Sequence, residues 1–182
     1  NVGGRKVWNV TGASNLEELR DRTVGLTLRR LKENVLDLPD KIITPVYLRL
    51  KSKSYENVMG EYYDWYDKNP EESKSLTVQF SKLTKVRQII ADEKIAQTIE
   101  LAENILEQDK KVIIFCNFTD SLNKITEHFG KVAVKLDGSM SKPERQNSVD
   151  QFQDNPKVKV FVGNIKAAGV GITLTAAEAV IM

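Results

Sequence analysis

Short apolar runs alternate with helix-like segments throughout the part of the chain that follows Lys110. The run Val112–Cys116 is apolar at every position, as expected of a strand that is buried on both faces of a sheet. Patterns of the two kinds continue to the end of the chain and predict helices over 120–129 and 142–153, and strands over 132–136, over 158–162 and from Val180. Helical crossovers join parallel strands, so this order predicts an α/β fold with a doubly wound, mainly parallel sheet over 110–182.

The preceding residues, 1–109, lack this alternation and are predicted to be mainly helical. Helical periodicity predicts three helices, over 54–68, 75–91 and 93–107. Ser14 and Glu17 have the spacing of a capping box, which predicts a short helix that starts near Asn15. The β-branched stretch 42–50 predicts one strand. We therefore expect a helical extension that precedes the lobe and packs on it.

The charged and aromatic residues of this extension indicate whether it could bind nucleic acid. Residues 1–53 hold 11 basic and 6 acidic residues, a net charge of +5, whereas residues 54–182 have a net charge of −3. A phosphate-rich partner would be drawn first to the basic third, although a solvated surface of mixed charge explains the excess more simply. The helix predicted over 54–68 is rich in tyrosine and tryptophan, and packing is favoured over stacking of these rings on bases.

The chain has one cysteine, Cys116, and one histidine, His128. An internal disulfide is therefore impossible, and a zinc site built from histidine and cysteine is excluded. No run approaches the roughly 20 apolar residues of a membrane span, and residues 1–30 lack the apolar stretch of a secretory signal. We expect no metal site in this chain, no membrane partner, and a location in the reducing cytoplasm or nucleoid, or in a nucleus.

A glycine-rich loop, Gly163–Thr175, follows one predicted strand and precedes another. Ligands of open α/β sheets bind beyond the carboxyl ends of the strands, where glycine lets the backbone approach a phosphate. Gly169 and Gly171 could serve in this way and Thr173 could donate to phosphate oxygens, whereas a plain tight turn explains the same residues. The chain contains neither a Gly-x-x-x-x-Gly-Lys-Ser/Thr phosphate loop nor paired acids for the magnesium of a nucleotide. Most of any nucleotide site would therefore lie elsewhere.

Several blocks of the sequence, taken together, resemble the Swi/Snf family of helicase-related ATPases in helicase superfamily 2. Leu28-Arg29-Arg30-Leu31-Lys32, followed by Leu36-Asp37-Leu38-Pro39-Asp40-Lys41, resembles the block that joins the family's two ATPase lobes. Lys111–Leu122 is similar to motif IV and Ala168–Thr175 to motif V. The spacing of three further features also matches the family: Leu83–Gln88, Leu136–Ser141, and Arg145 with Phe152. The resemblance spans residues 24 to 182 or so.

This resemblance implies a RecA-like second lobe over 110–182, preceded over 1–109 by the joining block and the helical extension. In the family, two such lobes close on ATP and Mg²⁺, which the first lobe mainly holds, and they track along double-stranded DNA without separating its strands. The phosphate loop and the arginine fingers of motif VI lie outside this chain, so we expect no catalytic residue here and no ATP hydrolysis by this fragment alone. The longer parent is expected to be a DNA-dependent ATPase that remodels DNA or protein–DNA complexes.

The resemblance also implies contacts to DNA phosphates from the joining block, from motifs IV and V and from the loop between them. The residues are Arg29, Arg30, Asn117, Phe118, Thr119, Gly138, Ser139, Lys142 and Thr173. Phe118 is equally well explained by packing under the sheet. Arg29 and Arg30 are also explained by contact with the first lobe or by local pairing with Glu33 and Asp37.

Two pairs of residues are expected to serve the nucleotide and the coupling between lobes. The resemblance places the backbone of Gly169 and Gly171 near the nucleotide. Arg87 and Arg145 are expected to have structural or coupling roles, and for Arg145 bracing of its own helix is favoured over phosphate contact.

Two other functions explain parts of the sequence. The alternative is a non-catalytic module that docks DNA or protein through the basic N-terminal region. An unrelated mononucleotide-binding α/β domain, such as a methyltransferase, explains the glycine loop but neither the Arg29-Arg30 block nor Leu38-Pro39.

Overall fold

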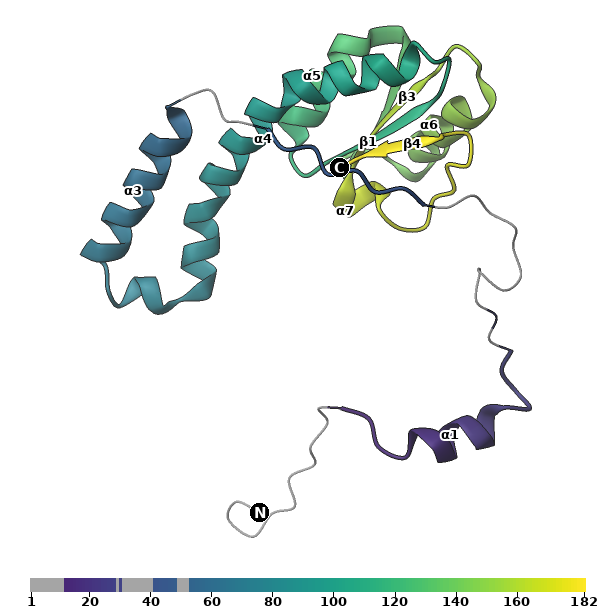
Figure 1. Ribbon diagram of the computed structural model, residues 1–182, viewed down its shortest axis with the longest axis horizontal. Helices are drawn as coiled ribbons and strands as arrows, with labels where there is room; N and C mark the ends of the chain where they lie inside the picture. Colours follow the sequence, from purple (N-terminus) through teal and green to yellow (C-terminus); the bar gives the residue numbers. More distant parts are fainter. Residues whose placement is uncertain (1–11, 29, 31–40, 49–52) are drawn as a thin grey trace. The chain divides into compact units, whose positions relative to one another are not determined.

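The computed structural model describes residues 12–28, 30, 41–48 and 53–182 (Figure 1). The chain divides into two compact units, Asn1–Val46 and Tyr47–Met182. In the first unit, α1 (Leu16–Thr23) is the predicted short helix, but its N-cap is Asn15, at φ 54°, and no side chain caps it. The strand expected over 42–50 is wrong for 42–48, which has no regular secondary structure, and residues 49 and 50 lie outside the described part.

Four strands in the second unit form one parallel sheet. They are β1 (Val112–Cys116), β2 (Ala133–Leu136), β3 (Val160–Asn164) and β4 (Ala179–Ile181), in the spatial order β2-β3-β1-β4. Val160 of β3 pairs with Val112 of β1 and with Ala133 of β2, and Val112 also pairs with Ala179 of β4. The predicted α/β fold with a parallel sheet is confirmed. Strand β3 begins two residues later than predicted, because Val158 still belongs to a turn in which its amide donates to Asn155 O.

Helices cover both faces of this sheet, as in a doubly wound fold (Figure 1). On one face, Ala102 of α4 (Leu76–Leu106) and Leu122 and Ile125 of α5 (Thr119–Phe129) pack on Val112, Ile114, Val160 and Val162. On the other face, Phe152 of α6 (Lys142–Asp154) and Ala168 of the short α7 (Ile165–Ala168) pack on Ile113 and Phe161. Successive residues of a strand point to opposite faces, and the continuous apolar run of β1 therefore supplies both cores.

The extension before the sheet is a helical hairpin. Helix α3 (Ser54–Lys68) has the predicted bounds, and the short η1 (Glu72–Lys74) leads into α4. Two helices were predicted over 75–107, but α4 is continuous, because the expected break at Asp92 contains neither glycine nor proline. The first part of α4 packs on α3 and its last part on the sheet and α5. A second 3₁₀ turn, η2 (Gly130–Val132), joins α5 to β2.

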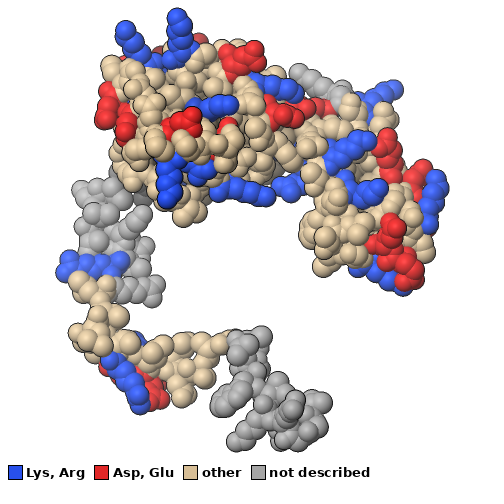
Figure 2. Space-filling view, turned by 180° about the vertical axis from the view of Figure 1, so that it is seen from behind, with Lys and Arg blue, Asp and Glu red and all other residues tan. Residues whose placement is uncertain are grey.

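The aromatic residues of α3 pack on one another and on α4. Tyr62 lies 5.7 Å from Tyr63, 6.0 Å from Trp65 and 6.3 Å from Tyr66, measured between ring centroids. Lys82 of α4 lies over the Trp65 ring. Lys, Arg, Asp and Glu side chains are interspersed over the face of the molecule seen in Figure 2. Within the part of the chain that the structure describes, no helix is long and apolar enough to cross a membrane.

Candidate nucleic-acid interface

The loops that follow β1, β2 and β3 meet at one edge of the sheet, because parallel strands all end on the same side. They enclose an open groove of about 420 Å³. Most of the residues that line it have polar side chains; the full lining is Thr119, Asp137, Gly138, Ser139, Arg145, Asn164, Lys166 and Ala167. Thr119, Gly138 and Ser139, which the sequence places in two separate motifs, therefore share one surface.

The loop after β2 is fixed by its buried carboxylate, Asp137. The Oδ1 atom of Asp137 accepts hydrogen bonds from the backbone amide of Ser139 at 2.8 Å and from its hydroxyl at 2.5 Å. These hydrogen bonds, with a smaller contribution from the nearby Lys135, hold the pKa of Asp137 below its ordinary value. The one acid that lines the groove is thus turned toward its own loop, and it leaves the outer surface of Gly138 and Ser139 exposed.

Arg145 holds the same loop from the side of α6. Its Nε donates to Met140 O and its Nη2 donates to Gly138 O, each at 3.0 Å. Helix α6 begins with a capping box in which Glu144 Oε2 accepts from the amide and the hydroxyl of Ser141, both at 2.7 Å, and these bonds lower the pKa of Glu144. Lys142, the first residue of α6, is exposed beside this loop.

The motif IV residues divide between two surfaces. The carbonyl of Asn117 accepts from Asn164 Nδ2 at 3.3 Å, which ties the end of β1 to the end of β3, and Thr119 begins α5 at the groove. Phe118 is half-buried, and the Arg87 guanidinium lies 6.0 Å from the centre of its ring. Phe118 is not among the residues that line the groove.

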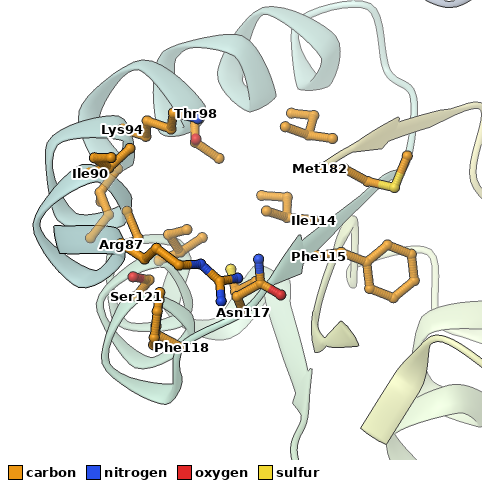
Figure 3. Close-up of a pocket in the computed structure, with 15 residues that line it drawn as sticks. Arg87, Ile90, Lys94, Thr98, Ile114, Phe115, Asn117, Phe118, Ser121 and Met182 are labelled. Carbon is orange, nitrogen blue, oxygen red and sulfur yellow. The ribbon is translucent and has the colours of Figure 1, made fainter. Parts of the chain in front are cut away.

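Phe118 and Arg87 instead line a second cavity, of about 250 Å³, between α4, α5 and the ends of β1 and β4 (Figure 3). Its wall is mainly apolar, and Arg87 and Lys94 supply the cations. Cys116 also lines it, and burial raises the pKa of its thiol to about 11. The thiol is therefore protonated at neutral pH and is a poor nucleophile.

The glycine loop after β3 turns at two positions that require glycine. A Cβ atom on Gly169 would lie 2.4 Å from the carbonyl oxygen of Ile165, and Gly171 has φ +79°. Gln153 of α6 anchors the end of the loop, since its Nε2 donates to Thr175 Oγ1 and its Oε1 accepts from the Ala176 amide, both at 2.9 Å. The hydroxyl of Thr175 therefore accepts a hydrogen bond from Gln153, whereas the side chain of Thr173 is exposed.

Sequence reasoning missed four residues of the groove, Asp137, Asn164, Lys166 and Ala167. Asn164 ends β3 and caps α7, accepting from the Lys166 amide at 3.1 Å, so it orients the Lys166 turn toward the groove. The predicted strand ended at residue 162, which hid the position of Asn164 at the carboxyl end of β3. Arg30 lies in the first unit and is exposed, and Arg29 lies outside the described residues.

Residues 93–182 match the model of the helicase conserved C-terminal domain. The chain is 31% identical to the human DNA annealing helicase and endonuclease ZRANB3, over 98% of this chain and 17% of that protein. It is also 31% identical to an uncharacterized ATP-dependent helicase of Mycoplasma pneumoniae, over 90% of this chain and again 17% of the relative. The chain thus spans about a sixth of the length of these curated relatives.

Two solved structures from Sulfolobus solfataricus share the fold. The C-terminal domain of a SWI2/SNF2 ATPase matches with a TM-score of 0.55 and 27% identity, over 69% of this chain and 65% of that chain. The SWI2/SNF2 ATPase core in complex with double-stranded DNA matches with a TM-score of 0.64 and 30% identity, over 90% of this chain and 40% of that chain. The fold, the family model and these relatives agree with the motifs of the sequence: this chain belongs to the Swi/Snf family of helicase-related ATPases and carries the family's C-terminal, RecA-like lobe.

Proposed function

We propose that this chain supplies the second lobe of a DNA-dependent ATPase that translocates on double-stranded DNA and remodels DNA or protein–DNA complexes. The observation that carries the proposal is the groove at the ends of β1, β2 and β3, where hydroxyl groups and a lysine from three loops converge. In this proposal residues 110–182 form the lobe and residues 1–109 form the joining block and the helical extension, whose last turns already contribute Ala102 to the core of the lobe.

The groove suits a phosphate backbone better than a base. Thr119 and Ser139 offer hydroxyl groups, and Lys166 offers an ammonium group without an ion-pair partner among the described residues. Helix α5 has 11 residues and no side-chain cap, so its first amides add the positive end of a helix dipole beside Thr119. Such contacts fix the register of DNA without reading its sequence, and they weaken as salt rises. The family neighbour solved with double-stranded DNA supports a duplex as the partner.

Motif V is proposed to contribute to the nucleotide site. The tight turn at Gly169 and Gly171 exposes backbone that we assign to the nucleotide, and the same loop carries the exposed hydroxyl of Thr173, which we assign to DNA. These groups fit a contact with phosphate oxygens. No group of three metal-ligating side chains occurs among the residues that the structure describes, so we assign Mg²⁺ mainly to the first lobe. When bound, ATP supplies the phosphoryl transfer that drives movement, and this chain positions DNA.

The decisive experiment measures ATP hydrolysis by the full-length parent without nucleic acid, with single-stranded DNA and with duplex DNA, and with this fragment as the blank. We expect duplex to stimulate hydrolysis strongly and the fragment to be silent. Thr173→Ala, at an exposed side chain, is expected to lower the stimulated rate while the protein stays folded. Gly169→Asp is expected to lower the rate as well, but it also strains the turn against Ile165 O. Absence of hydrolysis under every condition would favour a non-catalytic binding module.

A matched pair of lysines tests the groove itself. Lys166→Ala should weaken duplex binding several-fold for all sequences and reduce the slope of log K against log salt by about 1. Lys157→Ala, an exposed lysine before the opposite end of β3, should change neither quantity. Equal effects of the two substitutions would mean that the groove is not where DNA binds.

A further inference from the structure

The second cavity has no part in the function proposed above. It lies between α4, α5 and the ends of β1 and β4, with a volume of about 250 Å³, and none of the residues that line it also lines the groove (Figure 3). The loop of Gly169 and Gly171 contributes no residue to it either. A concave site with a mainly apolar wall and a few convergent polar groups is the usual form of a binding site for a small molecule.

The volume of the cavity limits the size of its ligand. An apolar cavity of roughly 150 Å³ holds one benzene molecule, whereas pockets for drug-sized ligands have volumes of roughly 300–1,000 Å³. A cavity of about 250 Å³ therefore suits a molecule with one ring or two fused rings. A nucleoside triphosphate is larger, and the lining contains neither a glycine for its phosphates nor a carboxylate for its Mg²⁺.

The inner wall of the cavity suits an aromatic ring. Ile114 of β1 and Ile125 of α5 are buried there, and Ile95 of α4 forms another side. Phe118 adds a phenyl ring and Cys116 a thiol, and both groups make favourable contacts with aromatic rings. Burial of a flat apolar body among these side chains would supply most of the free energy of binding.

Two cations of α4 give the cavity its charge. Arg87 and Lys94 are seven residues apart, so they lie on the same side of the helix and roughly 10 Å apart along its axis. Both are exposed, and neither forms an ion pair with a residue that the structure describes. Figure 3 shows the Arg87 side chain extending from α4 toward the end of β1. No aspartate or glutamate lines the cavity, so the two positive charges favour an anion.

A buried hydroxyl group in the wall also lacks a partner. Ser121, in the first turn of α5, is 5% exposed and lines the cavity. Its hydroxyl makes no hydrogen bond to any described residue. Buried hydroxyl groups without a partner are uncommon, because the loss of hydration costs free energy. A ligand with an acceptor oxygen would supply the missing hydrogen bond.

We propose that this cavity binds a small aromatic carboxylate. The carboxylate accepts hydrogen bonds from Arg87 and Ser121, and Lys94 adds a second positive charge. The ring lies in the apolar part of the cavity, against Ile95 and Ile114. Neither DNA nor ATP takes part in this binding, so the site is independent of the DNA-binding role proposed for the groove.

The test uses naphthylacetate and its neutral amide, naphthylacetamide, which share a bicyclic ring and differ in charge. Each is titrated into the 182-residue chain, and amide shifts in NMR spectra map the contact and give the Kd. We expect naphthylacetate to bind with a Kd of about 1 mM or below, with shifts in the second half of α4, at the end of β1 and at the start of α5. The amide should bind at least tenfold more weakly, and acetate, which has no ring, should show no binding.

Charge variants connect this binding to the two cations. Arg87→Gln with Lys94→Gln should weaken naphthylacetate at least tenfold and should change the Kd of the amide less than twofold. The matched control is Lys110→Gln with Lys157→Gln, which removes the same charge from exposed lysines at the opposite edge of the sheet. The control should change both Kd values less than twofold.

A variant that fills the cavity tests the location of the ring. Ala91 of α4 lines the cavity and is half-buried, so Ala91→Phe places a side chain where the ring of the ligand would lie. It should abolish the binding of both naphthyl compounds. Ser121→Ala should weaken naphthylacetate severalfold, because it removes one hydrogen bond. Circular dichroism shows whether each variant is folded, and the exposed cation pair still decides if Ala91→Phe is not.

Four outcomes would overturn the proposal. Absence of naphthylacetate binding, or equal binding of the acid and the amide, would show that the cavity does not select an aromatic anion. Shifts confined to the groove loops or to the helical hairpin would place the compound elsewhere. Unchanged binding by a folded Ala91→Phe variant would show that the ring does not enter the cavity. Displacement of naphthylacetate by ATP would assign the cavity to the nucleotide.

Discussion

The two halves of helix α4 lie in different surroundings. Its last turns pack against the sheet, where Ala102 is fully buried and Ile95 and Ile99 extend the core. Its first turns pack on α3 and η1, bury Val86 as their one core residue, and leave Leu76 and Phe80 exposed. One continuous helix thus joins a lobe with two apolar layers to a hairpin with a single helix–helix contact.

Because of this difference, the lobe stabilises the molecule, whereas the hairpin has apolar side chains available to partners. The lobe buries complete side chains on both faces of its sheet, and each contributes about 1.5–3 kcal/mol. The hairpin keeps its large apolar groups at the surface, so we expect it to open locally at a lower free energy than the lobe.

Truncating the centre of the lobe should have the largest effect. Phe161 of β3 is fully buried and its ring centre lies 5.5 Å from that of Phe152. Phe161→Ala should lower the free energy of unfolding by about 3–5 kcal/mol, because it leaves a cavity in the core. Val58→Ala in the hairpin should cost about 1–2 kcal/mol. Urea denaturation monitored by circular dichroism measures both, and equal losses would contradict the contrast.

The glycines provide a second test, because Gly169→Ala should lower the stability of the chain, whereas Gly60→Ala should raise it. Gly169→Ala places a Cβ atom 2.4 Å from Ile165 O, and it should destabilise the lobe by about 1–3 kcal/mol as the α7 turn shifts. The thermal midpoint of the chain measures the loss. An unchanged midpoint would mean that the turn relaxes freely.

The loop after β2 should respond to acid. Because the pKa of Asp137 lies below its ordinary value of 3.8, its stabilising effect is fully present above that pH and is lost as pH falls through the lower, folded-state pKa. Asp137→Asn should cost about 1 kcal/mol at neutral pH and should remove this part of the acid dependence. Unfolding measured from pH 6 to pH 2 for both proteins tests the prediction, which fails if the two curves stay parallel.

The smallest expected effect is a gain. Gly60→Ala in the hairpin meets no neighbour within 4 Å and should stabilise α3 by about 0.5–1 kcal/mol. Amide hydrogen exchange in α3 is the suitable measurement, because it reports local opening. Faster exchange in the variant would show that Gly60 has a role in the fold itself.

Local sequence patterns predicted the bounds of the elements in which a single local preference dominates. The continuous apolar run of β1 and the periodic, proline-terminated α3 have the predicted bounds. The predictions failed where two local preferences conflict. The Ile90–Glu93 segment contains neither glycine nor proline and stays helical in α4, and residues 42–48 have β-branched side chains but form no strand. The fold class followed from the order of elements, which is less sensitive to such errors.

The site was harder to predict than the fold. The resemblance named Thr119 and Ser139, but their proximity depends on the order β2-β3-β1, which no local pattern contains. Lys166 was missed because its position depends on where β3 ends. Phe118 was left with two explanations, and the structure places it beside Arg87 in the apolar cavity. The DNA and nucleotide roles of all these residues stay predictions.

The unbroken length of α4 has a mechanical consequence. A helix of 31 residues is about 46 Å long, and about 25 Å of it extends from the lobe as one arm of the hairpin. An arm of that length acts as a lever: when the lobe rotates by about 10°, the hairpin tip sweeps about 4 Å. The hairpin tip would therefore move further than the lobe surface itself, because α4 continues unbroken from one to the other.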